Sequence, residues 1–308
     1  MSDTARAADP ENELLLITCA GGKQASALIP ILRPKWKKLR LAVHSDVSAR
    51  ALREKYPDAD VVQADLVNPD DARRIMSGVS AIYHVGPSGT PHETQCGFNM
   101  IDAAVAEHGT FKHFVLSSVW PTQLRKLMNH DCKRYVEEYL MESGLNFTIL
   151  QPSHFFENTP VAFFTQQDNP VYPIPYNPDT KFSFTALRDL ADAAAAVLEG
   201  REKHFYAAYP IISTLPTRYS EFLEIVGRAI GKSIRVEKKS LEEGVALLAS
   251  RFNAKDEPRK MDVFERILLY YDKRGLWGNP GVSEWLLARK TTSCEEWAKM
   301  QAEACRPR

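Results

Sequence analysis

The chain has 308 residues, and its 39 basic residues are balanced by 39 acidic residues. A protein without net charge has no global field that recruits nucleic acid or an anionic membrane, so neither partner is expected. No apolar stretch approaches the roughly 20 residues of a membrane-spanning helix. Residues 1–12 are polar and are predicted to form a flexible tail. The five cysteines lack metal-binding spacing, so we expect a reduced, cytoplasmic protein without a metal site.

The first apolar run, residues 14–18, is typical of a buried parallel strand. A tight turn follows it and opens a helix at residues 25–32. A Rossmann fold binds the pyrophosphate of a dinucleotide at this place, because the helix N-terminus offers free N–H groups and partial positive charge. The turn therefore predicts a nucleotide site.

The glycine pattern of this turn departs from the full dinucleotide-binding fingerprint. Gly21 and Gly22 lie in the turn, but Cys19 occupies the first glycine position and Ala25 the last. Alanine is an accepted variant at the last position, whereas a cysteine at the first brings a Cβ penalty. The turn thus indicates descent from a nucleotide-binding protein more firmly than it indicates that this chain still binds a nucleotide. The predicted pyrophosphate-binding residues are Gly21, Gly22, Lys23 and Gln24.

Strands and helices alternate along the first half of the chain, as a parallel sheet requires. Further strands are predicted at residues 39–44, 60–64, 81–85, 114–117 and 147–150. Helices are predicted between them at residues 70–77, 92–107 and 130–142. We therefore predict the α/β fold class, with a Rossmann-type doubly wound parallel sheet. Its first strand should be central and adjacent to the fourth, with the ligand crevice at the carboxyl ends of the strands.

The second half of the chain has a looser pattern. Four prolines within residues 169–179 predict a wrapped loop. Further helices are predicted at residues 187–198, 219–230, 241–249 and 293–303. We expect a smaller, mostly helical C-terminal lobe that covers the substrate cleft. The predicted parts are a flexible tail at 1–12, a dinucleotide-binding Rossmann core at 13–150 and a substrate lobe at 151–308, with 180–210 returning to the core.

A set of motifs follows in order along the first two thirds of the chain. They are the turn at 18–22, the pair Asp65-Leu66, the strand end at 116–118, Lys133 with residues 137–140, residues 148–152 with Asn158, and residues 188–191. In order and spacing they resemble the NmrA-like family of atypical short-chain dehydrogenases/reductases, from about residue 13 to 199 and more faintly at 295–297. The resemblance implies a dinucleotide-binding fold. Some members reduce small molecules, and others bind NADP as redox-sensing regulators.

The resemblance also implies cofactor contacts beyond the first turn. An acid after the third strand contacts the adenine in this family, which indicates Asp65 with Leu66, although Asp65 is also placed to cap a helix. Gly86 ends the fourth strand, where the backbone passes close to the cofactor or simply turns. His44 ends the second strand in place of an acid for a ribose hydroxyl or an arginine for a 2′-phosphate, and Arg50 is a candidate for the latter role. The resemblance favours NADP over NAD and leaves open that no cofactor is bound.

Catalysis in short-chain reductases typically uses a serine, a tyrosine and a lysine four residues after the tyrosine. Lys133 matches the family's lysine, but Asn129 stands where the tyrosine is expected. Asparagine can hydrogen-bond an oxyanion but cannot release a proton at neutral pH. His130 is an alternative acid or a residue of the helix end, and Ser117 and Ser118 match the serine region or a plain strand terminus. The predicted catalytic residues are Lys133, His130, Asn129, Ser117 and Ser118.

Three aromatic residues, Trp120, His154 and Phe155, should lie near the cleft mouth, where they line a substrate pocket or pack the lobe interface. Three functions stay open. The first is an NAD(P)-dependent reductase of a small carbonyl or enone compound, and the second is an NADP-sensing regulator that contacts a protein partner. The third is a lyase, isomerase or cyclase that uses His130, Lys133 and His154 as acid and base. The polar residues of the cleft favour an enzyme with a small-molecule substrate, and a homodimer is compatible with the sequence.

Overall fold

A computed structural model describes residues 7–107, 109–252, 254 and 257–306. Its centre is a seven-stranded parallel sheet in the order β11-β6-β5-β4-β1-β2-β3. The strands are β1 (Leu14–Ile17), β2 (Lys38–Val43), β3 (Asp60–Gln63), β4 (Ala81–Val85), β5 (His113–Ser117), β6 (Phe147–Pro152) and β11 (Ala207–Ile211). Strand β1 pairs with both β2 and β4, so the strand order reverses beside it. The predicted doubly wound Rossmann-type sheet is therefore confirmed.

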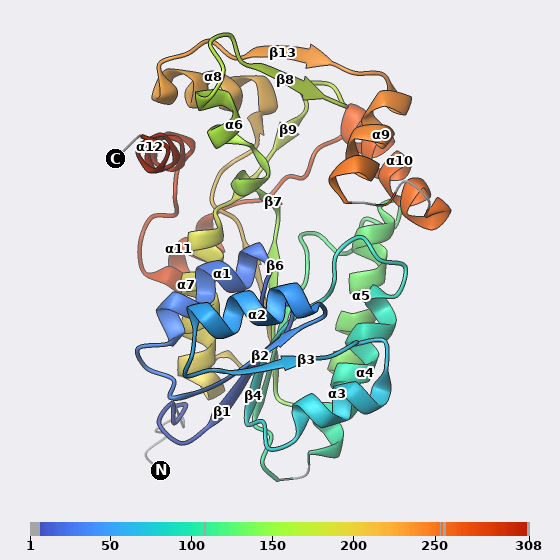
Figure 1. Ribbon diagram of the computed structural model, residues 1–308, viewed down its shortest axis with the longest axis vertical. Coiled ribbons are helices and arrows are strands. Elements are labelled where there is room, and N and C mark those ends of the chain that lie inside the picture. The colour runs from blue at the N-terminus through green and yellow to red at the C-terminus, as the bar shows by residue number, and fades with distance from the viewer. Residues whose placement is uncertain (1–6, 108, 253, 255–256, 307–308) are drawn as a thin grey trace.

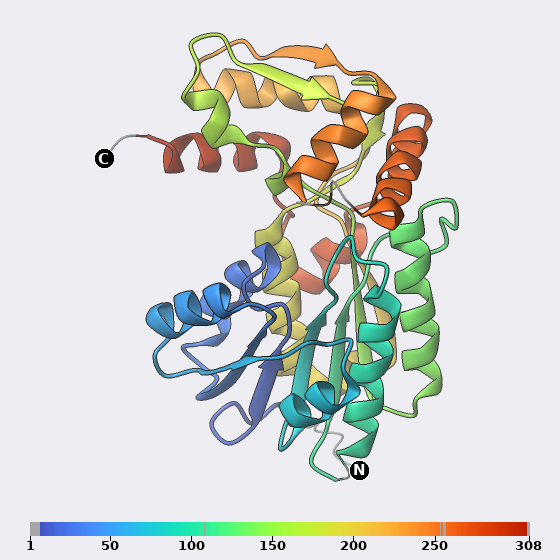
Figure 2. The same ribbon diagram turned by 45° about the vertical axis from the view of Figure 1, so that its right-hand side comes forward.

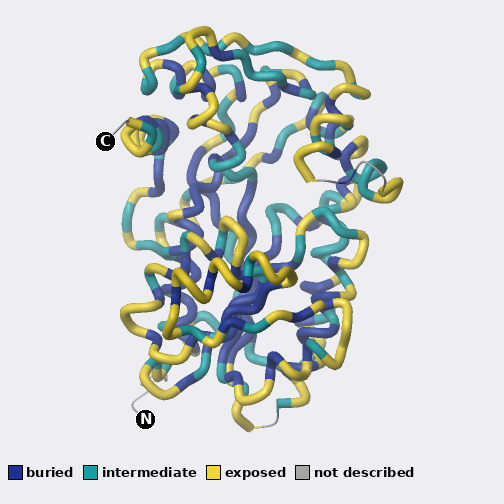
Figure 3. Tube along the Cα trace, viewed as in Figure 1, coloured by how far each residue is buried: buried dark blue, intermediate teal, exposed yellow. Residues whose placement is uncertain are grey.

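Helices cover both faces of the sheet (Figure 1). One face carries α1 (Lys23–Leu32), α2 (Asp46–Lys55) and α7 (Leu187–Gly200), and the other carries α3 (Pro69–Met76), α4 (Glu93–Ala106) and α5 (Met128–Glu142). Side chains alternate between the faces along each strand. Leu15 and Ile17 pack into the core on the first face and Leu16 into the core on the second. Figure 3 shows the buried chain running through these central strands.

The second half of the chain crosses between this sheet and a second lobe. Strand β7 (His154–Phe155) leaves the end of β6 and pairs with β10 (Phe184–Thr185). Helix α7, the short helix η2 (Arg201–His204) and strand β11 then return to the sheet, where β11 pairs with β6. The lobe stands beyond one end of the sheet (Figure 2).

The lobe is mostly helical. Its elements are η1 (Phe156–Asn158), α6 (Val161–Thr165), β8 (Val171–Ile174), β9 (Lys181–Phe182), β12 (Thr217–Arg218), α8 (Tyr219–Ile230), β13 (Arg235–Lys238), α9 (Leu241–Arg251), α10 (Pro258–Lys273) and α12 (Cys294–Ala304). Helix α11 (Gly281–Leu287) instead packs against α7 and β11 of the sheet core. Residues 171–174, expected as part of a loop, form a strand paired with β13 despite Pro173, because proline is tolerated in such edge pairings. Among the described residues, none of the helices combines the length and apolarity needed to cross a membrane.

Aromatic side chains fill the core of the lobe. The rings of Phe156 and Phe184 stack with their centroids 4.7 Å apart, and the ring of Trp297 lies 5.1 Å from that of Phe156. Trp297 comes from α12, near the C-terminus, so the last helix completes a core that begins just after β6.

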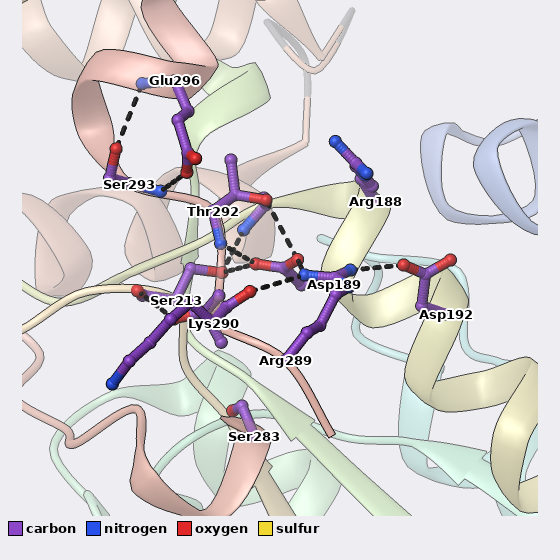
Figure 4. Close-up of polar contacts among 12 residues, drawn as sticks. Arg188, Asp189, Asp192, Ser213, Ser283, Arg289, Lys290, Thr292, Ser293 and Glu296 are labelled. Atoms are coloured by element: carbon purple, nitrogen blue, oxygen red, sulfur yellow. Dashed lines mark hydrogen bonds and ion pairs between the residues drawn. The ribbon is translucent and has the colours of Figure 1, made fainter. Parts of the chain in front are cut away.

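A buried carboxylate on α7 anchors the C-terminal segment (Figure 4). Asp189 is fully buried, and its Oδ2 accepts hydrogen bonds from Ser213 Oγ at 2.6 Å and from Thr292 N at 2.8 Å. Its Oδ1 accepts from Thr292 Oγ1 at 3.0 Å and from Arg289 Nη1 at 2.8 Å. Arg188, the preceding residue, points away from this cluster. Asp189 thus joins α7, the end of β11 and the segment that leads into α12.

Candidate functional site

The turn after β1 leaves the N-terminus of α1 open. Gly22 is the N-cap, no side chain in the described chain caps the helix, and its first turn contains no acid. Cys19 has a φ of +47°, the left-handed conformation that glycine adopts without penalty. For cysteine this conformation costs about 1–2 kcal/mol. The first position therefore keeps the backbone shape of a glycine turn, and an uncapped helix N-terminus of this kind favours an anion.

A cavity of about 430 Å³ lies at the carboxyl ends of β1 to β4. This volume is within the usual range of small-molecule and cofactor sites. Cys19 borders it after β1, His44 after β2, and Asp65 and Leu66 after β3. The cavity thus brings together three of the predicted cofactor residues, His44, Asp65 and Leu66, with the strained residue of the first turn. Pro87, Ser88 and Thr90 after β4, Cys96 of α4 and Lys260 of α10 also line it.

Asp65 serves the local turn while it lines the cavity. Its Oδ1 accepts a hydrogen bond from Val67 N at 3.0 Å, and its own N–H donates to Asp71 Oδ2 at 2.9 Å. These bonds shape the approach to α3. Asp65 therefore acts in the approach to the helix, while Asn68 is the N-cap of α3, and Asp65 also lines the cavity.

Lys133 forms a buried ion pair with Glu93, the first residue of α4. Only 4% of the Glu93 side chain and 16% of the Lys133 side chain are exposed. Burial opposes the charge of Lys133, but the adjacent Glu93 carboxylate outweighs it and raises the lysine pKa. A second, small cavity of about 10 Å³ borders the pair and is lined also by His84, Gly86 and Ser117. The ion pair therefore keeps the Lys133 ammonium protonated and fixed in position, so Lys133 does not act as a base.

Glu93 is not among the site residues predicted from the sequence. An acid in the first turn of a helix is commonly stabilised by the helix dipole, so the position of Glu93 does not by itself indicate a functional site. Gly86 is placed against it, because a Cβ on Gly86 would lie 2.9 Å from Glu93 Oε1. The strand-four glycine thus makes room for the carboxylate that holds Lys133.

A polar atom on the helix of Lys133 has no partner. Asn129 Oδ1 is buried and lacks a hydrogen bond, whereas the buried Ser118 hydroxyl lies beside the Glu137 carboxylate. Buried polar atoms are normally paired, so the orphaned Asn129 acceptor fits a ligand that supplies the missing bond. Asn129 precedes Lys133 by one helical turn on α5, as the helical stripe predicts.

His130 is directed into the interior. It is 1% exposed, its Nδ1 bonds the carbonyl oxygen of Pro121 at 2.8 Å, and it lines neither cavity described above. Burial lowers its pKa to about 4. A neutral ring that donates from Nδ1 keeps its other nitrogen unprotonated, so His130 holds no proton to give at neutral pH.

Three other predicted residues, Lys23, Gln24 and Ser117, are held by hydrogen bonds. Ser117 Oγ donates to Gln24 Oε1 at 2.7 Å, and Tyr83 OH donates to the same oxygen at 3.0 Å. Lys23 Nζ donates to the carbonyl oxygen of Glu157 at 2.7 Å. The first turn of α1 is therefore tied to β4, to β5 and to the start of the lobe.

The aromatic candidates divide between the lobes. Trp120 Nε1 donates to the carbonyl oxygen of Trp277 at 2.8 Å and so links the core to the C-terminal part. His154 lies among lobe rings, with the Phe182 centroid at 5.1 Å, and its Nε2 is buried and unpartnered. Phe155 packs against the core of the sheet. His154 is thus the member of the three with a free polar atom.

Buried histidines are expected to make the fold acid-sensitive. Burial lowers the pKa of His84 and His113 to about 3, and the pKa of His130 and His154 to about 4. In the unfolded chain each titrates near 6.5. The unfolded state therefore binds more protons between these values. The stabilisation is complete above about pH 6.5 and is lost as the pH falls toward about 4.

Urea unfolding between about pH 7 and about pH 5 measures this loss as a falling free energy of unfolding. His113→Gln removes one titrating group and keeps a polar partner for Thr148, whose Oγ1 lies 2.8 Å from His113 Nε2. We expect the free energy of unfolding of this variant to decrease less with falling pH than that of the wild type. A wild-type stability that does not change over this range would contradict the prediction.

The comparisons with known proteins come from sequence and from structure. The sequence profile of the NmrA-like family matches residues 11–261. None of the curated proteins compared with the chain matches it.

Solved structures share the fold. NADPH-dependent quinone oxidoreductase QOR2 from Escherichia coli, complexed with NADPH, has a TM-score of 0.75 at 20% identity, over 94% of this chain and 99% of that chain. Triphenylmethane reductase from Citrobacter sp. has a TM-score of 0.76 at 18% identity, over 94% and 99%. The negative transcriptional regulator NmrA, in complex with NADP, has a TM-score of 0.74 at 17% identity, over 96% and 98%. At these identities the likeness establishes the fold alone.

Proposed function

The chain belongs to the NmrA-like family, and we propose that it is an NADP-dependent reductase of a small carbonyl or enone compound. The observation that carries the proposal is the cavity of about 430 Å³ at the carboxyl ends of β1 to β4. Cys19, which borders it, belongs to the turn that leads to the uncapped N-terminus of α1. Ligands of doubly wound sheets bind at this crevice. Residues 13–150 would bind the cofactor, and the lobe within 151–308 would cover the substrate. Free thiols at all five cysteines support a reducing, cytoplasmic location.

The residues around Lys133 fit the nicotinamide end of such a cofactor. When bound, the reduced cofactor would supply a hydride. Lys133 would orient the ribose hydroxyls through its ammonium group, which Glu93 keeps charged and in place. The unpaired Asn129 Oδ1 would bind a polar group of the ligand. Because Asn129 and His130 hold no proton to release, the proton of the reaction would come from water or from the substrate.

A dinucleotide-sensing regulator is the second candidate. It is favoured by one observation: the family lysine is held in a buried ion pair with Glu93 and has no tyrosine in its helical stripe. The regulator NmrA, which shares the fold, was solved with NADP. The non-redox alternative receives no support from His130, because that ring is buried and bonded to a backbone carbonyl.

Turnover separates these functions. Purified protein would be assayed with a panel of quinones, enones and aldehydes, with NADPH, with NADH and without either. The proposal expects turnover that requires NADPH. Tight NADPH binding without turnover of any substrate would favour the regulator, and turnover without a cofactor would favour the non-redox enzyme. A protein that binds neither dinucleotide would overturn both dinucleotide functions.

Gly22→Asp is expected to weaken dinucleotide binding by about ten- to a hundredfold, or about 1–3 kcal/mol. The new carboxylate would cap α1 and occupy the anion position that the pyrophosphate needs. Gly22 has a φ of −83°, so the backbone tolerates a side chain, although its Cβ would lie 3.1 Å from the Cys19 carbonyl oxygen. Calorimetric titration with NADPH measures the loss.

Gly22→Asn is the matched control, because it has nearly the same shape without the charge. We expect it to bind NADPH better than Gly22→Asp does, while thermal melting shows both variants folded. Wild-type affinity in a folded Gly22→Asp variant would mean that this turn does not hold the pyrophosphate.

A further inference from the structure

A lysine of the second lobe lines the cofactor cavity. Lys260 lies in the first turn of α10, and 21% of its side chain is exposed. It borders the same cavity as His44 and Asp65, which follow β2 and β3. We propose that Lys260 binds the 2′-phosphate of NADP and so sets the preference for NADP over NAD. This inference rests on the proposed dinucleotide function.

The charges of the cavity support a phosphate on this side. Among the described residues that line it, Lys260 carries the one fixed positive charge and Asp65 the one carboxylate. Asp65 Oδ1 is already bonded to Val67 N. An extra phosphate would therefore meet an available cation, and a charged donor binds phosphate oxygens more strongly than a neutral one.

The end of β2 lacks the acid that an NAD site uses. His44 follows the strand, and Ser45 caps α2 by accepting a hydrogen bond from Ser48 N at 3.2 Å. Asp46, the next residue, is exposed and does not line the cavity. No carboxylate of this turn is therefore placed on the ribose 2′-hydroxyl, which is the contact that favours NAD.

Arg50, the cation that the sequence offers for the 2′-phosphate, lies elsewhere. It is exposed on α2, and the cavity is not lined by it. Lys260 is more than 200 positions away in the sequence but faces the cavity, because α10 packs beside α5 above the strand ends (Figure 1). The cation that lines this cavity is thus Lys260 of the second lobe and not Arg50 of α2.

Lys260 is free to turn toward a phosphate. Its present partner is Glu257 Oε1 at 2.7 Å, and 47% of the Glu257 side chain is exposed. Ion pairs between neighbouring, partly exposed residues of one helix end are held weakly. The flexible lysine stem and a doubly charged phosphate make exchange of partners favourable.

The test is calorimetric titration of the full chain with NADPH, NADH, 2′,5′-ADP and 5′-AMP. Lys260→Ala is expected to weaken NADPH and 2′,5′-ADP by about tenfold or more, and NADH and 5′-AMP by less than about twofold. Lys260→Arg should keep the preference because it keeps the charge. Arg50→Ala is the matched control, and it should leave the ratio of the two affinities unchanged. Thermal melting confirms that each variant is folded, and alanine suits this helical position.

Each other outcome overturns the assignment. Equal loss of NADPH and NADH in Lys260→Ala would make Lys260 a general contact, and no loss would remove it from the site. A preference that disappears in Arg50→Ala and survives in Lys260→Ala would assign the phosphate to α2. A wild-type protein that binds NADPH keeps the proposed function intact in all three cases. A wild-type protein that binds neither dinucleotide overturns the function and this inference together.

Discussion

Lys133→Ala is expected to abolish turnover and to destabilise the fold in a single substitution. The Glu93 carboxylate, which is 4% exposed, would lose its counter-ion and remain buried. Removing one partner of a buried ion pair costs about 3–5 kcal/mol, because the remaining charge is neither solvated nor paired. Urea unfolding measures this loss, and NADPH-dependent turnover measures the catalytic one.

A double variant separates the two effects. Lys133→Met with Glu93→Gln removes both charges and keeps side chains of similar volume. Replacing a buried pair by uncharged residues is close to neutral for stability, so most of the lost free energy should return. Turnover should not return, because the cation that would orient the cofactor is absent. A double variant with wild-type turnover would exclude Lys133 from the site, and a stable Lys133→Ala variant would contradict the buried pair.

The sheet could be predicted because its signals are local. Continuous apolar runs mark β1 and β4 to β6, and each was predicted within two residues of its bounds. Helix α8 was predicted at its observed bounds, since its apolar stripe is regular. Strand β8 was missed, because Pro173 and its neighbouring prolines give the pattern of a loop, and only pairing with β13 makes it extended.

The candidate site depends on contacts between segments that are distant in the sequence, and such contacts are harder to predict from the sequence. Glu93 begins α4 and Lys133 lies in the second turn of α5. The two helices are neighbours because β4 pairs with β5, so the strand order brings the two residues together and no motif does. To place Lys260 at the cavity, one must know the orientation of α10 in the fold, and helical periodicity in the sequence does not give this orientation. His130 follows Asn129 by one residue, which turns it by about 100° away from the stripe of Asn129 and Lys133, and its ring is buried in the interior.

Asp189→Ala is expected to lower the free energy of unfolding by about 3–5 kcal/mol. The carboxylate is fully buried, and its loss leaves Thr292 N, Thr292 Oγ1 and Ser213 Oγ without their acceptor. Arg289 keeps its ion pair with Asp192, so the damage is concentrated at the buried donors. Urea unfolding measures the loss. Arg188→Ala is the matched control, because Arg188 is exposed and should change stability by less than about 0.5 kcal/mol.

The anchor at Asp189 also reaches the first turn of α1 through a chain of contacts. It fixes the segment before α12, where Trp297 Nε1 donates to Glu157 Oε1 at 3.0 Å. Glu157 in turn accepts Lys23 Nζ through its backbone carbonyl oxygen at 2.7 Å. We therefore expect Asp189→Ala, under conditions where it stays folded, to be cleaved by protease first in the segment after α11 and to bind NADPH more weakly. Proteolysis that begins elsewhere, with wild-type NADPH affinity, would show that the C-terminal segment holds its place without Asp189.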